Sequence, residues 1–152
     1  ASRGLGDVYK RQVGDYWAHW LEMGKILGDK APKIFNVNWF KQDENGNFIW
    51  PGFGDNMRVL DWIIKRVEGK VDAVETPIGF LPKKGDINLK GIEDEVTSEV
   101  EDKLLAVDVD LWKKEIAEMR RYYNDDIKAK GGNIPQALYD ELDKIEARLN
   151  KA

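Results

Sequence analysis

The stretch from Lys33 to Asn56 reads KIFNVNWFKQDENGNFIWPGFGDN and decides how this chain is organised. Its first part, Lys33–Phe40, is rich in aromatic and branched residues, which predicts a β-strand. The segment Asp43–Asn47 contains an Asn-Gly pair, which is typical of tight hairpin turns. Phe48–Trp50 is therefore the expected return strand. Pro51–Gly54 alternates proline and glycine with one phenylalanine, which predicts a loop.

Helical periodicity surrounds this stretch on both sides. The expected helices are Gly14–Leu27, Asp55 to Gly69, Val96–Leu105, Val109–Lys128 and Pro135–Leu149. In the second of these, the expected buried face is Met57, Leu60, Ile63, Ile64 and Val67. Ala73–Thr76 is expected to form another short strand. The predicted fold class is α+β, with a small mixed sheet around Lys33–Trp50 against helices and a C-terminal helical hairpin.

Composition narrows the classes of function. The 152 residues carry a net charge of −4 and contain no cysteine. An acidic chain does not suit a nucleic-acid backbone or an anionic membrane, so we expect neither as a partner. No apolar stretch reaches the roughly 20 residues that a membrane helix needs. The absence of cysteine is compatible with a reducing compartment, and we expect a cytoplasmic location. We also expect the protein to be a monomer.

Common nucleotide and metal motifs are missing from the sequence. No G-x-x-x-x-G-K-[ST] phosphate loop occurs, and Met57 replaces the third glycine of a dinucleotide fingerprint that begins at Gly52. His19 is the only histidine, which excludes histidine-pair zinc sites. These absences exclude a histidine-pair zinc site and a phosphate loop of that pattern.

The aromatic residues are the most informative feature. The chain has 6 Trp, 5 Tyr and 5 Phe. One interpretation makes them core, because large aromatic rings dominate core energetics, and it suits Trp17, Trp20, Phe35 and Trp62. It suits Phe53 poorly, since this ring lies between two glycines in a loop. A slot of rings beside an asparagine amide is the alternative, because rings stack on a planar base and the amide can read its edge.

The N-terminal segment is interpreted separately. Residues 2–12, ending in DVYKRQ, look like a translated sequencing adapter rather than natural protein. We therefore expect residues 1–12 to be a disordered artefact, and residues 13–152 to be a portion of a longer protein.

From residue 13 onward the sequence resembles the GTP-dependent phosphoenolpyruvate carboxykinases. The resemblance rests on Gly14-Asp15-Tyr16, Pro32-Lys33-Ile34-Phe35, Glu75-Thr76-Pro77-Ile78-Gly79 and above all on Phe48–Asn56, FIWPGFGDN. It implies an incomplete C-terminal part of the nucleotide-binding lobe of that fold. It also implies the family's activity, a gluconeogenic carboxy-lyase reaction that converts oxaloacetate and GTP to phosphoenolpyruvate, CO2 and GDP.

The resemblance further implies which residues bind. Trp39, Phe40, Phe48 and Phe53 are expected to form the walls of a guanine pocket, with Phe40 and Phe53 on opposite faces of the base, and Asn56 is expected to read its edge. The family's Mn²⁺ ligands, phosphate loop and reactive cysteine are expected upstream of this chain, so the chain alone is expected to be inactive. Lys41-Gln42 replace a usually more basic pair, which bears on phosphate affinity.

Two alternatives remain open at this stage. The chain could be a stand-alone purine-nucleotide-binding module, or a non-catalytic structural or interaction domain whose aromatic residues are purely structural.

The adapter interpretation makes a prediction about the gene. Natural genomic DNA upstream of Val13 is expected to encode residues unrelated to ASRGLGDVYKRQ, and sequencing across this junction from the source genome tests it. Genomic codons for Ser2–Gln12, continuous with the frame of Val13, would show that the segment is natural.

Overall fold

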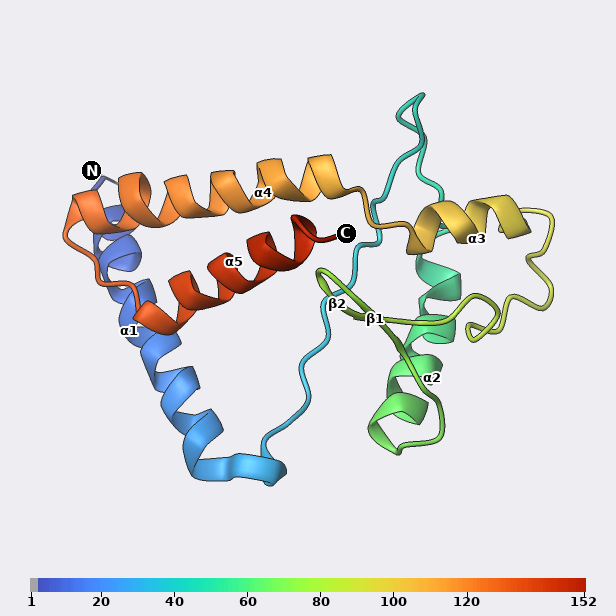
Figure 1. The fold of residues 1–152 in the computed structure, drawn as a ribbon, viewed down its shortest axis with the longest axis horizontal. Coiled ribbons are helices and arrows are strands. Elements are labelled where there is room, and N and C mark those ends of the chain that lie inside the picture. Colours follow the sequence, from blue (N-terminus) through green and yellow to red (C-terminus); the bar gives the residue numbers. More distant parts are fainter. Residues whose placement is uncertain (1–2) are drawn as a thin grey trace. The chain divides into compact units, whose positions relative to one another are not determined.

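The computed structural model describes residues 3–152, with side chains from residue 12 onward. The chain divides into two compact units, one formed by residues 1–32 with 108–152 and the other by residues 33–107. Within the described residues, no helix is long and apolar enough to cross a membrane. The fold combines helices with a small sheet (Figure 1). The predicted α+β class is therefore confirmed, as far as the types of element are concerned.

The first unit is helical. Its elements are α1 (Arg3–Leu27), α4 (Val109–Arg121), a π-helical turn at Tyr122–Ile127 and α5 (Gln136–Leu149). As predicted, α4 and α5 pack against each other as a hairpin (Figure 1). The Asp108 side chain caps α4 by accepting a hydrogen bond from the Leu111 backbone N–H at 2.9 Å.

The core of this unit consists of aliphatic side chains, and aromatic rings pack beside it. Five side chains are buried in it: Ile116, Ile127, Ile134, Leu142 and Leu149. Beside them the Tyr123 ring contacts Trp17, with centroids 5.7 Å apart, and Tyr139, at 5.6 Å. Trp20 was predicted to be core and is instead 52% exposed, paired on the surface with Tyr16.

Helix α1 begins earlier than predicted, at Arg3 rather than near Gly14. Residues 1–12 were predicted to be an artefact, and two of them, residues 1 and 2, lie outside the described residues. The backbone of residues 3–12 forms the first part of α1. Whether this segment derives from an adapter stays a prediction.

The second unit surrounds a core built on tryptophan. Trp50, Ile92 and Val96 are buried together, and the side chains that pack on them are Trp39, Val59, Ile87, Leu89, Val100 and Leu104. The elements of this unit are α2 (Asn56–Val67), β1 (Val74–Thr76), β2 (Gly79–Leu81) and α3 (Ser98–Leu105). Trp62 of α2 is also buried, so the prediction of Trp62 as core is confirmed. Phe35, predicted as core as well, lies edge-on to Trp62 but is 36% exposed.

The sheet differs from the predicted one in place and in type. It has two antiparallel strands, with Val74 opposite Leu81 and Thr76 opposite Gly79. The predicted strand Ala73–Thr76 is thus confirmed, whereas the predicted sheet around Lys33–Trp50 is wrong. That stretch holds one isolated antiparallel bridge, Gln42 to Phe48. Strand propensity expresses packing against neighbouring strands, and no described strand lies beside residues 33–40.

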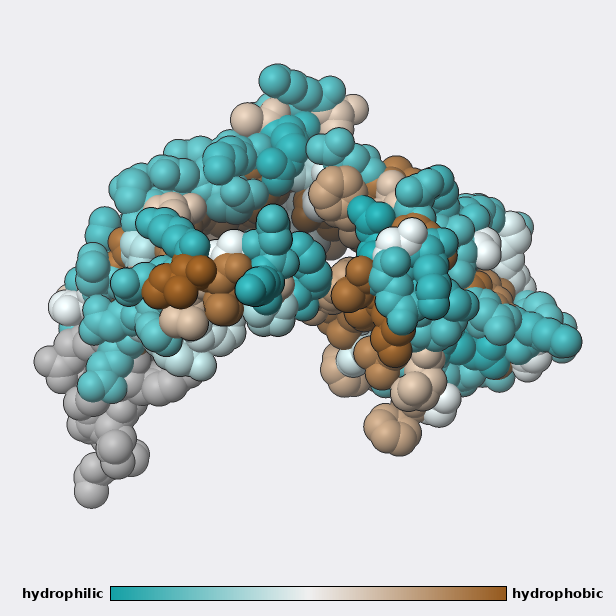
Figure 2. Space-filling view, turned by 90° about the horizontal axis from the view of Figure 1, so that it is seen from below, coloured by the Kyte–Doolittle hydropathy of each residue, from teal (hydrophilic) through white to brown (hydrophobic). Residues whose placement is uncertain are grey.

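The predicted buried face of α2 is also largely wrong. Met57, Ile64 and Val67 are each more than half exposed. The helix has the expected apolar stripe, but no element of its own unit covers it. Figure 2 shows apolar residues, in brown, exposed on the face turned to the viewer. Amphipathic periodicity predicts that a face is apolar, but the partner of that face must come from tertiary structure.

Two glycines of α1 give a matched test of the packing in the first unit. A Cβ on Gly14 would lie 1.4 Å from the Asn133 carbonyl oxygen, whereas a Cβ on Gly24 would have no atom within 4 Å. Gly14→Ala is expected to lower the free energy of unfolding by about 1–3 kcal/mol. Gly24→Ala is expected to raise it by about 0.5–1 kcal/mol, because alanine is the better helix former.

Urea unfolding followed by far-UV circular dichroism measures both changes. Equal effects of the two substitutions would show that α1 does not approach the Asn133 backbone.

Candidate functional site

The predicted site residues lie between residues 39 and 56 of the second unit. A turn at Asp43–Asn47 organises the first part of this segment. The Asp43 carboxylate accepts hydrogen bonds from the backbone N–H groups of Asn45 and Asn47, both at 2.9 Å, and from the Asn47 side chain at 3.2 Å. Gly46 has a φ of 81°, and Asn45 stays at negative φ. The turn is thus a reverse turn ending in a left-handed glycine, and the Asn-Gly pair was correctly predicted as a turn signal.

The turn brings two predicted pocket walls together. The Phe40 and Phe48 rings lie with centroids 5.7 Å apart at an interplanar angle of 64°. The Ile49 backbone N–H donates to the Lys41 carbonyl at 3.0 Å, which holds the two sides of the turn in register. Both rings are exposed, Phe40 by 70% and Phe48 by 59%. They are therefore available for stacking.

Phe53 lies on a separate short element. It begins a 3₁₀ turn, Phe53–Asp55, which leads directly into α2. The preceding Gly52 has a φ of 119°, a conformation that a residue with a Cβ rarely adopts. The Phe53 side chain is 92% exposed and makes no ring contact with any described residue. Its placement opposite Phe40 across a base stays a prediction.

Asn56 is the first residue of α2, and its side chain is tied to the core. Its Oδ1 accepts a hydrogen bond from the Trp50 indole Nε1–H at 2.9 Å. Trp39 packs on the same indole, with ring centroids 6.5 Å apart. The structure thus groups the predicted residues in two pairs and a single residue: Phe40 with Phe48, Trp39 and Asn56 through Trp50, and Phe53 on its own turn.

An arginine that sequence reasoning missed secures the start of α2. The Arg58 guanidinium pairs with Asp55, Nε to Oδ1, at 2.8 Å. It also donates to the carbonyls of Asn88 and Lys90, at 2.7 and 3.0 Å. Asp55 is the N-cap residue of α2, but its side chain makes no capping hydrogen bond and serves this ion pair instead. The i,i+3 spacing of an acid and a base was the sequence signal that could have found it.

Lys41 has a structural role beside the predicted pocket. Its Nζ donates to the carbonyls of Leu104 and Ala106, at 3.2 and 3.0 Å, at the C-terminal end of α3. A cation there satisfies carbonyls that lack a helical partner and complements the helix dipole. The link joins the base of the turn to α3.

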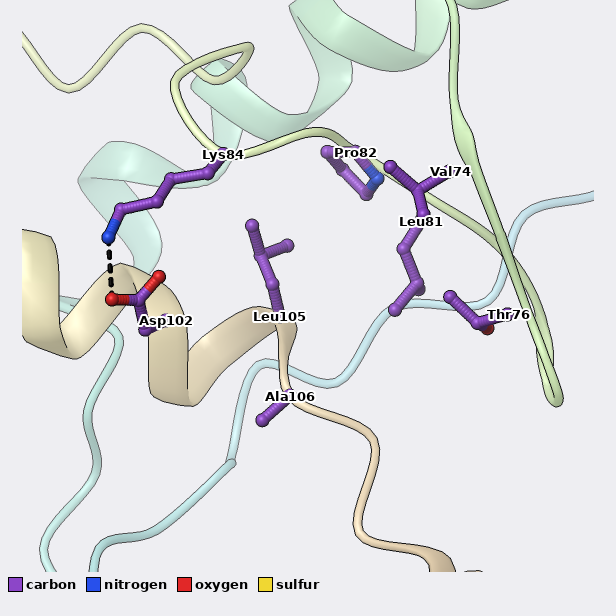
Figure 3. Close-up of a pocket in the computed structure, with 8 residues that line it drawn as sticks. All are labelled: Val74, Thr76, Leu81, Pro82, Lys84, Asp102, Leu105 and Ala106. Atoms are coloured by element: carbon purple, nitrogen blue, oxygen red, sulfur yellow. Dashed lines mark hydrogen bonds and ion pairs between the residues drawn. The ribbon is translucent and has the colours of Figure 1, made fainter. Parts of the chain in front are cut away.

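Two hollows adjoin these elements. One of about 290 Å³ lies between the β1–β2 hairpin and the end of α3, with the Lys84–Asp102 ion pair, at 2.5 Å, on its rim (Figure 3). Its lining is otherwise mostly apolar, and no predicted site residue belongs to it. The second, of about 210 Å³, is lined by Phe48, Ile49, Trp50, Pro51, Glu95 and Val100, so it borders one of the predicted walls.

The described residues do not fit a manganese site. Among them, no three side chains of the types that ligate metals converge. No chemical step through a metal is therefore derived for this chain.

Comparison with known proteins gives the family. The family profile described as "Phosphoenolpyruvate carboxykinase C-terminal P-loop domain" matches residues 6–148. The chain belongs to the phosphoenolpyruvate carboxykinase (GTP) family. Among its relatives are proteins named phosphoenolpyruvate carboxykinase [GTP] from Treponema pallidum, 45% identical over 139 residues, and Chlamydia abortus, 47% identical over 138 residues. A mitochondrial form from Mus musculus is 42% identical over 138 residues.

These matches cover 90–91% of this chain but only 20–22% of each relative. The chain thus spans about a fifth of the length of the carboxykinases that it resembles. The family match begins at residue 6, inside the segment that looks like an adapter.

The Asp43 turn predicts a pH dependence next to Phe40 and Phe48. Hydrogen bonds from Asn47, and then from Asn45, hold the pKa of the Asp43 carboxyl below its ordinary value of 3.8. A group with a lowered pKa in the folded state stabilises it above its unfolded pKa and loses this effect as pH falls through the folded one. The turn is therefore expected to loosen below pH 3.8.

The backbone amide shifts of Asn45 and Asn47, followed by NMR from about pH 7 to pH 2, report on this change. Asp43→Asn keeps an acceptor but removes the titrating group, so the acid transition is expected to disappear in that variant. A midpoint at or above 3.8 for the two amides would contradict the prediction.

Proposed function

We propose that this chain is the base-recognition part of a longer GTP-dependent phosphoenolpyruvate carboxykinase. The whole enzyme would convert oxaloacetate and GTP to phosphoenolpyruvate, CO2 and GDP. The observation that carries this proposal is family membership over residues 6–148. The named activity of the relatives, each about 4–5 times longer than this chain, supports the same assignment.

The proposed role of this chain is to bind guanine. Trp39, Phe40, Phe48 and Phe53 would form the walls of the base site, and Asn56 would read the base edge. The exposure of three of these rings supports the assignment, because a purely structural aromatic core would bury them. Each stacked base–aromatic contact contributes about 1–3 kcal/mol. The half-buried Trp39 would form the floor rather than a stacking face.

The remaining chemistry is proposed to lie in the part of the enzyme that this chain does not span. The 152 residues hold no G-x-x-x-x-G-K-[ST] loop for phosphates, and the described residues hold no metal-binding cluster. The uncovered apolar stripe of α2, with Ile64 and Val67, is consistent with a missing neighbour. We propose that this lobe completes the carboxykinase fold only with the rest of the enzyme.

The compartment and the oligomeric state stay predictions, cytoplasm and monomer respectively. Relatives named as mitochondrial occur in the same family.

The test of the function uses a complete enzyme that carries this chain. In a chimera, residues 14–150 replace the matching fifth of the Treponema pallidum carboxykinase, which is 45% identical there. Phe53→Ala is expected to raise the KM for GTP about tenfold, because a stacking face is lost. The KM for oxaloacetate and the free energy of unfolding are expected to stay unchanged, since the ring is 92% exposed.

Phe80→Ala is the matched control, an exposed phenylalanine of the same unit that lies outside the proposed site. It is expected to leave the KM for GTP unchanged. A Phe53→Ala chimera that loses stability but keeps its KM for GTP would favour the purely structural alternative. Tight GTP binding by the 152-residue chain alone would instead favour a stand-alone purine-binding module.

A further inference from the structure

The hydrogen bond between Trp50 and Asn56 fixes more than packing. Trp50 is 6% exposed, and the only polar atom of its side chain, Nε1, donates to Oδ1 of Asn56 at 2.9 Å. An indole N–H is a donor only. The atom that faces it must therefore be the amide oxygen of Asn56, although the NH2 end of the amide has nearly the same shape.

A flip of the Asn56 amide would break this arrangement. It would place the Nδ2 hydrogens against the indole N–H, so that donor faces donor and the buried indole N–H has no acceptor. Asn56 is held in one of the two orientations that an asparagine amide can take.

The orientation leaves a defined set of groups free on Asn56. The backbone N–H of Asn56 donates to the Phe53 carbonyl and is therefore occupied. No described group accepts a hydrogen bond from Nδ2. A ligand beside Asn56 thus meets two N–H donors and the second lone pair of Oδ1.

We propose that Trp50 is a positioning residue that sets base selectivity by locking the Asn56 amide. The inference rests on the proposed function, since it assumes that Asn56 faces the base. Guanine presents the acceptor O6 beside the donor N1–H, which matches Nδ2–H beside Oδ1. Adenine presents a donor, N6–H, beside the acceptor N1, and would require the flipped amide that Trp50 forbids.

Trp50 is also a core residue, so its two roles must be separated by experiment. Trp62 supplies the matched control. It is 4% exposed in the same unit, and its Nε1 is buried without a hydrogen-bond partner among the described residues. Trp50→Phe and Trp62→Phe each remove an indole N–H and a similar volume from this unit. Only the first releases an asparagine amide.

The experiment measures the inhibition constants of guanosine and adenosine against GTP in the chimera that carries residues 14–150. Nucleosides are used because the base, not the phosphates, is the proposed ligand of this part. The unaltered chimera is expected to prefer guanosine on the order of tenfold, within the range for discrimination by a bidentate pair. Trp50→Phe is expected to abolish the preference, and Trp62→Phe to retain it.

A second measurement uses NMR on the unaltered chimera, labelled at Trp and Asn, and so does not depend on a variant that folds. The Trp50 indole proton is expected to exchange with solvent far more slowly than that of Trp20, which is 52% exposed. The Asn56 Nδ2 protons are expected to shift on addition of guanosine and not on addition of adenosine.

The outcomes separate this proposal from the one that it rests on. A chimera with no preference for guanosine overturns both the guanine site and the lock. A preference for guanosine that persists in Trp50→Phe overturns the lock alone. Asn56 Nδ2 protons that ignore guanosine overturn both, because the lock assumes that Asn56 faces the base. Loss of the preference in both tryptophan variants would assign the effect to general loss of packing and would also overturn the lock.

Discussion

The buried Trp50 indole is the constraint on which the second unit depends. Its ring is the centre of the core with Ile92 and Val96, and its single polar atom is satisfied by Asn56 at the first residue of α2. A buried donor without a partner costs about 1–3 kcal/mol. One contact therefore fixes where the loop after Trp50 re-enters regular structure and how the Asn56 amide is oriented.

Around this anchor, the exposed aromatic rings are carried on short, individually tied segments. The Asp43 turn holds Phe40 against Phe48, Lys41 ties the base of that turn to α3, and Arg58 ties the start of α2 to the Asn88–Lys90 backbone. Each tie uses a charged or polar side chain on backbone groups. Such bonds order irregular backbone where no sheet or helix does so.

Local signals in the sequence predicted local structure well. The Asn-Gly turn, the α4–α5 hairpin and the strand beginning near Ala73 are all present, because each forms between segments that lie close together in the sequence. The strand Lys33–Phe40 and the buried face of α2 were wrong. Both depend on a partner surface, and the apolar pattern does not say whether the chain contains it.

The run FIWPGFGDN is enough to indicate the family, and the sequence also carries the turn and helix signals and the set of aromatic residues proposed to meet a base. Which rings are exposed, which are core, and which orientation the Asn56 amide takes follow from tertiary contacts. The physical reason is that exposure and hydrogen-bond pairing depend on the environment of a side chain. Trp50 and Phe48 lie two residues apart, yet one is the core and the other is open to solvent.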